Sequence, residues 1–189
     1  MRRRQIETGN ALPRLWLVSD ARNDAQLETT LSRLPRGSGL IFRHYHLAKG
    51  PRLARFHALK ALCRRKGHAI VLAGTGREAR RLGADGSYGP PVPAPGPLRL
   101  AAVHSLRELA RANRARVRLA LLSPAFPTRS HPGARRLGPL RFRLIAARAA
   151  MPVLALGGMN PRSARRLKPF GWAAIDGLTA KAGTNPEDS

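Results

Sequence analysis

The chain has 189 residues, the length of a single domain. Lysine and arginine number 35 against 10 acidic residues, a net charge of +25, and 43% of residues are hydrophobic, which excludes an intrinsically disordered chain. The single cysteine, Cys63, excludes a disulfide framework and a multi-thiolate zinc site. No run approaches the ~18–20 apolar residues of a membrane span, and MRRRQIETG lacks the apolar segment of a signal peptide. We therefore expect a basic cytoplasmic protein with no membrane partner.

The positive charge is spread along the chain rather than gathered in one block. Arginines run from Arg2 to Arg166, and aromatic residues make up only 5% of the sequence. Nothing resembles the alternation of aromatic and basic residues that is typical of single-strand nucleic-acid binding. The distribution favours a solvated, arginine-rich surface, with nucleic-acid binding as the less favoured alternative.

In the first half of the chain, short apolar runs alternate with amphipathic stretches. Leucines at 27, 31 and 34 have helical spacing, and Pro51 and Gly67 suit the first turn and the end of a helix. The sequence Thr75-Gly-Arg-Glu78 is a capping box. We expect strands at 15–19, 39–44, 69–73 and 84–88, with helices at 23–34, 51–66 and after Thr75.

The second half continues the alternation after a proline-rich interruption. The segment 89–97 (GPPVPAPGP) predicts a loop, because its prolines have no N–H to donate to a helix or sheet. A second capping box, Ser105 to Glu108, opens a helix, and Asn160-Pro161 has the form of an N-cap and a first-turn proline. We expect strands at 98–104, 117–122, 152–156 and 173–178, helices at 105–115, 140–150 and 160–168, and a loop at 123–138.

Eight apolar strands that alternate with helices indicate a parallel sheet covered on both faces. We predict a single compact (β/α)₈ TIM-type barrel, with a doubly wound open sheet as the structural alternative. The chain is short for a barrel, so we expect the helix after the fourth strand to be replaced by the proline loop, and the eighth helix to be short or missing. The expected organisation is a basic N-terminal segment (1–14), a barrel (15–180) and a polar tail (181–189).

In such barrels the functional residues lie at the C-terminal ends of the strands. Glycines after the seventh strand and a small turn after the eighth offer backbone N–H groups to a phosphate, and the loop through Thr128, Arg129 and Ser130 converges on the same rim. Strands one and eight are neighbours in a closed barrel, so Asp20 and Asp176 are expected to approach each other. The candidate positions at strand ends are Asp20, Arg43, His104, Gly157, Gly158 and Thr179, and Asp176 is expected within the eighth strand.

Several segments of the chain resemble the thiamine phosphate synthase family, which includes the related thiazole tautomerases. The region of the family's sixth and seventh strands is resembled by the pair SPAFPTRSHPGARRLGP and PVLALGGMNP. The family's fifth strand and its helix are resembled by AAVHSLRELARA, and the entry to its fourth strand is resembled by RRLGADGSY. The segment FRHYH lies where the family has an Arg-x-Lys signature. The resemblance runs from Leu15 to Thr179.

The resemblance implies a small-molecule phosphate or pyrophosphate substrate, with release of pyrophosphate from a pyrimidine and capture of the carbocation by a thiazole nitrogen. Carried over by position, Arg43 contacts the pyrophosphate, and Thr128 and Ser130 hold phosphate or thiazole oxygens. Gly158 and Thr179 present amides to the thiazole phosphate. Two further residues, His104 as a proton-transfer group or substrate contact and Arg129 as a phosphate neutraliser, complete the candidate set.

The chain departs from the family where the family binds Mg²⁺. The family's Asn/Asp pair at the third strand corresponds to Ala73 and Gly74, and its acidic ligand after the fourth strand falls in 90–93, which has no acid. Tyr45 stands at the position of the lysine in the family signature, and Pro124 stands at the position of the catalytic histidine of the tautomerases. Mg²⁺ is therefore expected for the family but unmatched here, and we assign no cofactor.

Two interpretations of the family resemblance remain open. The protein is either a diverged synthase-like enzyme that uses arginines in place of Mg²⁺, or a phosphate-binding relative that has lost or changed its chemistry. The histidines at 44, 46 and 131 have no recognisable metal-ligand spacing, so the sequence assigns no metal.

Overall fold

The computed structural model describes residues 12–93, 98–128, 133 and 136–179. Eight parallel strands form a closed barrel in sequence order, and β1 closes it by pairing with β8, with Leu15 opposite Trp172. The fold expected from the sequence is confirmed. The strands are β1 (Leu15–Val18), β2 (Gly39–Phe42), β3 (Ala69–Ala73), β4 (Gly86–Gly89), β5 (Leu98–Val103), β6 (Leu119–Leu122), β7 (Val153–Ala155) and β8 (Gly171–Ala174).

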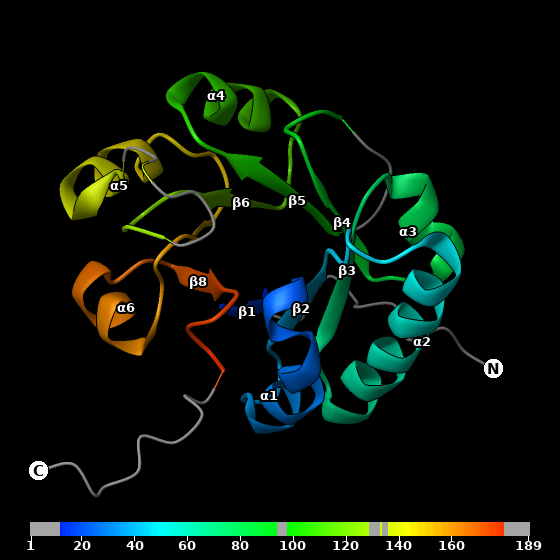
Figure 1. The fold of residues 1–189 in the computed structure, drawn as a ribbon. Helices are drawn as coiled ribbons and strands as arrows, with labels where there is room; N and C mark the ends of the chain where they lie inside the picture. Colours follow the sequence, from blue (N-terminus) through cyan, green and yellow to red (C-terminus); the bar gives the residue numbers. More distant parts are fainter. Residues whose placement is uncertain (1–11, 94–97, 129–132, 134–135, 180–189) are drawn as a thin grey trace, which may run out of the picture.

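Helices surround the strands, with α1–α3 on one side of the barrel and α4–α6 on the other (Figure 1). The expected first helix is split into a 3₁₀ helix and an α-helix. None of the helices in the described ranges is long and apolar enough to cross a membrane. The helices are η1 (Ala21–Gln26), α1 (Leu27–Arg33), α2 (Lys49–Lys66), α3 (Gly76–Leu82), α4 (Leu106–Arg114), α5 (Gly138–Ala146) and α6 (Pro161–Leu167).

Alternate residues along each strand point into and out of the barrel, because side chains in a strand have a period of two. Trp16, Ile41 and Val71 belong to an apolar cluster that fills the interior, whereas Leu17, Leu40 and Ile70 pack outward against helices. A Cβ at Gly39 would lie 2.4 Å from Cζ3 of Trp16, so this glycine makes room for the indole. The interior is therefore a packed core, and the site must lie at its rim.

The connection between β4 and β5 has no helix among its described residues, and a buried arginine covers the outer face there. Arg99 is only 6% exposed. Its guanidinium donates hydrogen bonds to the Pro90 carbonyl (2.6 Å) and the Ser87 hydroxyl (3.4 Å). Burial lowers the pKa of Arg99, which nevertheless remains charged at neutral pH. The expected proline loop thus has a polar anchor that the sequence analysis did not identify.

The last strand differs from the prediction. It spans Gly171–Ala174 rather than 173–178, so Asp176 lies in the turn beyond it. Residues 180–189, where a short eighth helix or the polar tail was expected, lie outside the described residues, as does most of the N-terminal segment.

Candidate active site

At the C-terminal rim of the barrel, the residues that follow each strand continue its alternation of inward- and outward-facing side chains. Trp16 and Val18 point inward in β1, and two residues further on is Asp20; Ile41 in β2 is followed in the same way by Arg43. Tyr88 of β4 contacts the interior cluster. The period of two therefore places an acid, an arginine and a tyrosine around one opening.

Arg43 is the cation that follows β2 at this rim. Its positive charge acts on two rim groups: it adds to the lowering of the Asp20 pKa by Arg22, and it partly opposes the rise in the pKa of Tyr88. Burial is the larger influence on Tyr88 and raises the pKa of its hydroxyl, and the nearby Tyr45 adds to this. The guanidinium carbon lies 5.7 Å from the centre of the Tyr45 ring, and the backbone N–H donates to Ser19 Oγ (2.8 Å). Arg43 is thus held at the rim, half-buried.

Asp20 and Asp176 come together as predicted, through an arginine between them. Arg22 Nε lies 2.9 Å from Asp20 Oδ1, and Arg22 Nη1 lies 3.4 Å from Asp176 Oδ2. Burial raises the pKa of Asp20, but the hydrogen bonds from Arg22 and the charges of Arg22 and Arg43 outweigh it, and the net shift is downward. Both carboxylates therefore neutralise a cation of the chain itself.

The end of β3 is occupied by another such pair. Arg52 Nη2 donates to the Ala73 carbonyl (3.1 Å), and Arg52 Nη1 lies 3.5 Å from Glu78 Oε1. A Cβ at Gly74 would lie 2.8 Å from Glu78 Oε2, so this carboxylate sits against the position where the sequence lacks the family's acid. Mg²⁺ requires several hard oxygen ligands, and the rim carboxylates described here are each paired with an arginine. The residues present do not fit a Mg²⁺ site.

The predicted phosphate loop at Gly157 and Gly158 has a packing role that the sequence did not show. Both have positive φ, and an added Cβ would meet Pro124 Cα at 2.9 Å and Pro127 O at 2.4 Å. The loop after β6 is therefore pressed against the loop after β7. Among the residues that the structure describes, neither glycine amide donates a hydrogen bond.

Of the other predicted phosphate contacts, only some lie within the described residues. Thr128 is half-buried beside this loop contact, whereas Arg129, Ser130 and His131 lie outside the described residues. Thr179 donates its amide (3.2 Å) and its hydroxyl (2.6 Å) to the Asp176 carbonyl. Its donors thus close the turn after β8 in this structure.

His104 follows β5 and is exposed. Its Nδ1 lies 3.1 Å from both the carbonyl oxygen and Oγ of Ser123, the residue that follows β6. The ring also lines a groove of about 570 Å³ between α4 and α5, outside the barrel. His104 thus connects two strand ends.

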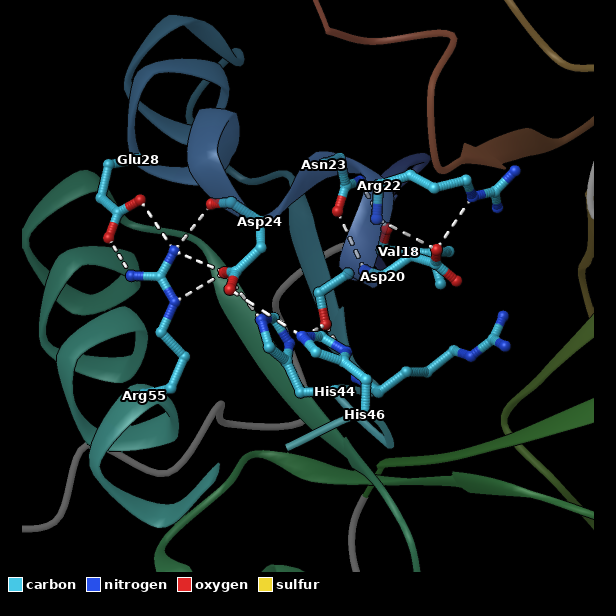
Figure 2. Close-up of polar contacts among 11 residues, drawn as sticks. Val18, Asp20, Arg22, Asn23, Asp24, Glu28, His44, His46 and Arg55 are labelled. Carbon is cyan, nitrogen blue, oxygen red and sulfur yellow. Dashed lines mark hydrogen bonds and ion pairs between the residues drawn. The ribbon is translucent and has the colours of Figure 1, made fainter. Parts of the chain in front are cut away.

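A second polar cluster lies behind the rim, between β2, η1 and α2, and the sequence analysis missed it. His44 is fully buried, with Nδ1 2.7 Å from Ser19 Oγ and Nε2 2.8 Å from Asp24 Oδ1. Figure 2 shows Asp24 between the two histidines and Arg55, which also binds Glu28. Burial lowers the pKa of His44, the charges of His46 and Arg55 add to this, and the hydrogen bond and charge of Asp24 only partly offset it. The sequence analysis found no metal-ligand spacing among the histidines, because only the fold brings Asp24 to His44 and His46.

Comparisons with known proteins agree with the sequence resemblance. Residues 101–179 match the family model described as thiamine monophosphate synthase. No curated protein matched the chain. The structure is similar to a thiamine phosphate pyrophosphorylase from Pyrococcus furiosus, with a TM-score of 0.73 and 24% identity over 90% of this chain and 89% of that one.

A second solved structure, titled "Native KDPGal structure", has a TM-score of 0.61 and 12% identity over 93% of this chain and 88% of that one. At these identities the structural likenesses show the fold, and the family evidence lies in the part from β5 to the turn after β8. The chain is a closed (β/α)₈ barrel that resembles the thiamine monophosphate synthase family and matches its model over residues 101–179.

Proposed function

We propose that this protein is a thiamine phosphate synthase-like protein of thiamine biosynthesis that binds thiazole phosphate at the C-terminal rim. The observation that carries the proposal is the position of Arg43, whose charge acts on both Asp20 and Tyr88 at the opening of a barrel with this family signature. A phosphate ester carries the charge that a half-buried guanidinium can bind in bidentate fashion. The amides of Gly157 and Gly158, which donate to none of the described residues, offer further donors.

The proposed reaction couples this thiazole phosphate to a pyrimidine methyl pyrophosphate. The bond between the methylene carbon and the pyrophosphate oxygen breaks, and pyrophosphate leaves with the electron pair. The thiazole nitrogen then forms the new C–N bond to the pyrimidine-stabilised carbocation. Positioning and neutralisation of the leaving group are what the protein must supply, and the rim arginines, Arg43 above all, supply the charge. The alternative is a relative that binds the phosphate ester without turnover.

Calorimetric titration with thiazole phosphate tests the binding step. We expect Arg43→Met to weaken binding by at least about tenfold, because a charge-assisted hydrogen bond contributes about 1.5–3 kcal/mol. The matched control is Arg33→Met, which removes the same charge from the last turn of α1, at the opposite end of the barrel. Equal affinities of the parent protein and Arg43→Met would overturn the assignment.

Two further arms separate the alternatives. Release of pyrophosphate from the mixture of both substrates supports the enzyme, and binding without release supports the non-catalytic relative. If the basic surface instead binds nucleic acid, its affinity for a DNA duplex will fall steeply with salt, with a log–log slope that scales with the number of phosphate contacts. Binding in the rim should depend on salt far less.

A further inference from the structure

Three potential metal ligands converge outside the rim, on the outer side of β2. The ligand atoms of Asp24, His44 and His46 all lie within 4.8 Å of one another. His44 Nε2 lies 2.8 Å from Asp24 Oδ1, and His46 Nε2 lies 4.0 Å from Asp24 Oδ2. The two imidazole rings are 5.1 Å apart between centroids and tilted by 34°. In Figure 2 both imidazoles lie beside the Asp24 carboxylate.

The surroundings of His44 hold it in the orientation that a metal ligand needs. Its ring stacks on Phe42 at 4.5 Å, and its Nδ1 contacts Ser19 Oγ. In this structure the Nε2–H of His44 donates to Asp24 Oδ1. A metal ion would take the place of that proton, and the Nδ1–H of His44 would then donate to the Ser19 hydroxyl oxygen, which already accepts the Arg43 N–H and has a second lone pair. Ligating histidines in metal sites almost always have such a partner on the other ring nitrogen.

The local charge also favours a cation, although the chain as a whole carries +25. Arg55 pairs with both Asp24 and Glu28, so two carboxylates and one guanidinium leave a net charge of −1 beside the two imidazoles. Arg55 approaches Oδ1 of Asp24, and Oδ2 faces His46. Arg55 and His44 thus share Oδ1, and the guanidinium leaves Oδ2, the oxygen that faces His46, uncovered.

We propose that Asp24, His44 and His46 form a Zn²⁺ site with an open coordination position. Two imidazoles and a carboxylate are typical ligands of Zn²⁺, whereas Mg²⁺ and Ca²⁺ prefer oxygen ligands alone. With bonds of about 2.0–2.1 Å, tetrahedral Zn²⁺ separates its ligand atoms by roughly 3.3 Å. The His46–Asp24 pair must therefore close slightly and the His44–Asp24 pair must open slightly. Asp24 and His46 are 30% and 33% exposed, so water can complete the coordination shell.

The site is independent of phosphate binding at the rim, but it lies next to it along the chain. His44 immediately follows Arg43, and His44 and Asp24 belong to segments that follow neighbouring strands, β2 and β1. A bound Zn²⁺ would therefore join the segment that carries Arg43 to η1. The inference stands or falls on metal binding alone, whatever ligand the rim takes.

Metal titration of the untagged protein tests the proposal, since a histidine tag would bind the same ions. We expect one Zn²⁺ per chain by calorimetry, and a visible absorption band when Co²⁺ is added as the spectroscopic probe. His46→Gln and Asp24→Asn should each weaken binding by more than the ~10–100-fold typical of outer-shell substitutions. The matched control is His57→Gln, which removes an exposed histidine from α2 and should leave both signals unchanged.

A further variant tests the role of the buried serine. Ser19→Ala should weaken metal binding by about 10–100-fold, because it removes the hydroxyl that orients His44. His44 itself is buried, so the variants of the two partly exposed ligands, Asp24 and His46, carry the test, with circular dichroism to confirm that they fold. Absence of Co²⁺ absorption in the parent protein would overturn the proposal. The proposal would also be overturned if His46→Gln bound Zn²⁺ as tightly as the parent protein, or if His57→Gln lost as much Zn²⁺ affinity as His46→Gln.

Discussion

Arg52 donates a hydrogen bond from Nη2 to the carbonyl oxygen of Ala73, at the end of β3, and its Nη1 lies 3.5 Å from Glu78. A cation of the chain thus occupies the strand end where the family resemblance led us to look for the residues that hold Mg²⁺ and pyrophosphate. Where the family resemblance implies an Asn/Asp pair, this chain has Ala73 and Gly74 with an arginine beside them, and this bears directly on the metal requirement.

Binding of pyrophosphate at the rim should be independent of Mg²⁺. The carboxylates there are paired with Arg22 and Arg52, so added Mg²⁺ finds no ligand set, and equal affinities with and without the ion are expected. Glu78→Gln should tighten pyrophosphate binding by up to about fivefold, because the carboxylate no longer competes for Arg52. Glu108→Gln, in the first turn of α4, is the control. Turnover that requires Mg²⁺ would contradict this prediction.

Removing the buried arginine between β4 and β5 should destabilise the barrel. Arg99→Ala deletes the donor to the Pro90 carbonyl and leaves a void under the proline loop. We expect the free energy of unfolding to fall by about 1–3 kcal/mol, measured by urea denaturation. Arg118→Ala, an exposed arginine just before β6, should change it by less than about 0.5 kcal/mol. Similar losses in the two variants would show that Arg99 does not anchor the loop.

Asp85 should make the protein less stable as pH rises. Burial raises the pKa of its carboxyl, and the hydrogen bond from the Ile70 N–H together with the charges of Arg64 and Lys60 only partly offsets this. A raised pKa in the folded state gives stability that is present at low pH and is lost as pH rises through that pKa.

The matched variant for this carboxyl is Asp85→Asn, which keeps an acceptor for Ile70 but cannot ionise. The difference in unfolding free energy between variant and parent should move in favour of the variant from about pH 4 to pH 7. Urea denaturation across this range measures it. A difference that stays constant with pH, or one that favours the parent as pH rises, would refute the assignment.

Cys63 should be chemically inert in the folded protein. Its side chain is fully buried in α2, and burial raises the pKa of the thiol to about 12. Because the thiolate is the reactive form, a thiol reagent should label the native protein only as fast as it unfolds, and should label it rapidly in denaturant. Fast stoichiometric labelling under native conditions would count against the packing described for this helix.

Gly158→Ala should be more destabilising than its backbone conformation alone explains. Its φ is 63°, and an added Cβ would meet the Pro127 carbonyl oxygen at 2.4 Å. Gly37→Ala is the control, since that glycine has a φ of 83° but no atom within 4 Å of the added Cβ. Thermal unfolding should show a cost of about 1–2 kcal/mol for the control and a further ~1–3 kcal/mol for Gly158→Ala. Equal costs would mean that the two loops do not press on each other.

The alternation of strands and helices was predictable because apolar runs and capping boxes are local signals. Thr75 and Ser105 cap their helices as the sequence indicated, and β3 has the predicted bounds. The end of β8 was not predictable, since the apolar residues Ile175 and Leu178 continue the pattern after the strand pairing has stopped. Apolar residues indicate buried positions, and the turn after β8 is still partly buried, so the apolar pattern runs past the end of the strand.

The candidate site was only partly predictable for the same reason. Asp20 and Arg43 could be identified from the sequence, because they follow predicted parallel strands and the C-terminal ends of parallel strands all lie at the same rim. The pairing of Arg52 with Glu78, and of His44 with Asp24, joins residues that are 26 and 20 positions apart. Nothing local in the sequence signals such contacts, so they become visible only when the helices are placed against the barrel.

The barrel has two separate outer cores around its filled interior. One surrounds β5–β8 and the other lies between β1–β3 and their helices; Leu178 is the one partly buried residue of the described ranges that contacts both. Destabilising substitutions in different outer cores, for example at Phe142 and Phe56, should therefore be additive. The half built on β5–β8 is also the half that matches the family model. Each half of the barrel is consequently able to accumulate substitutions while leaving the packing of the other in place.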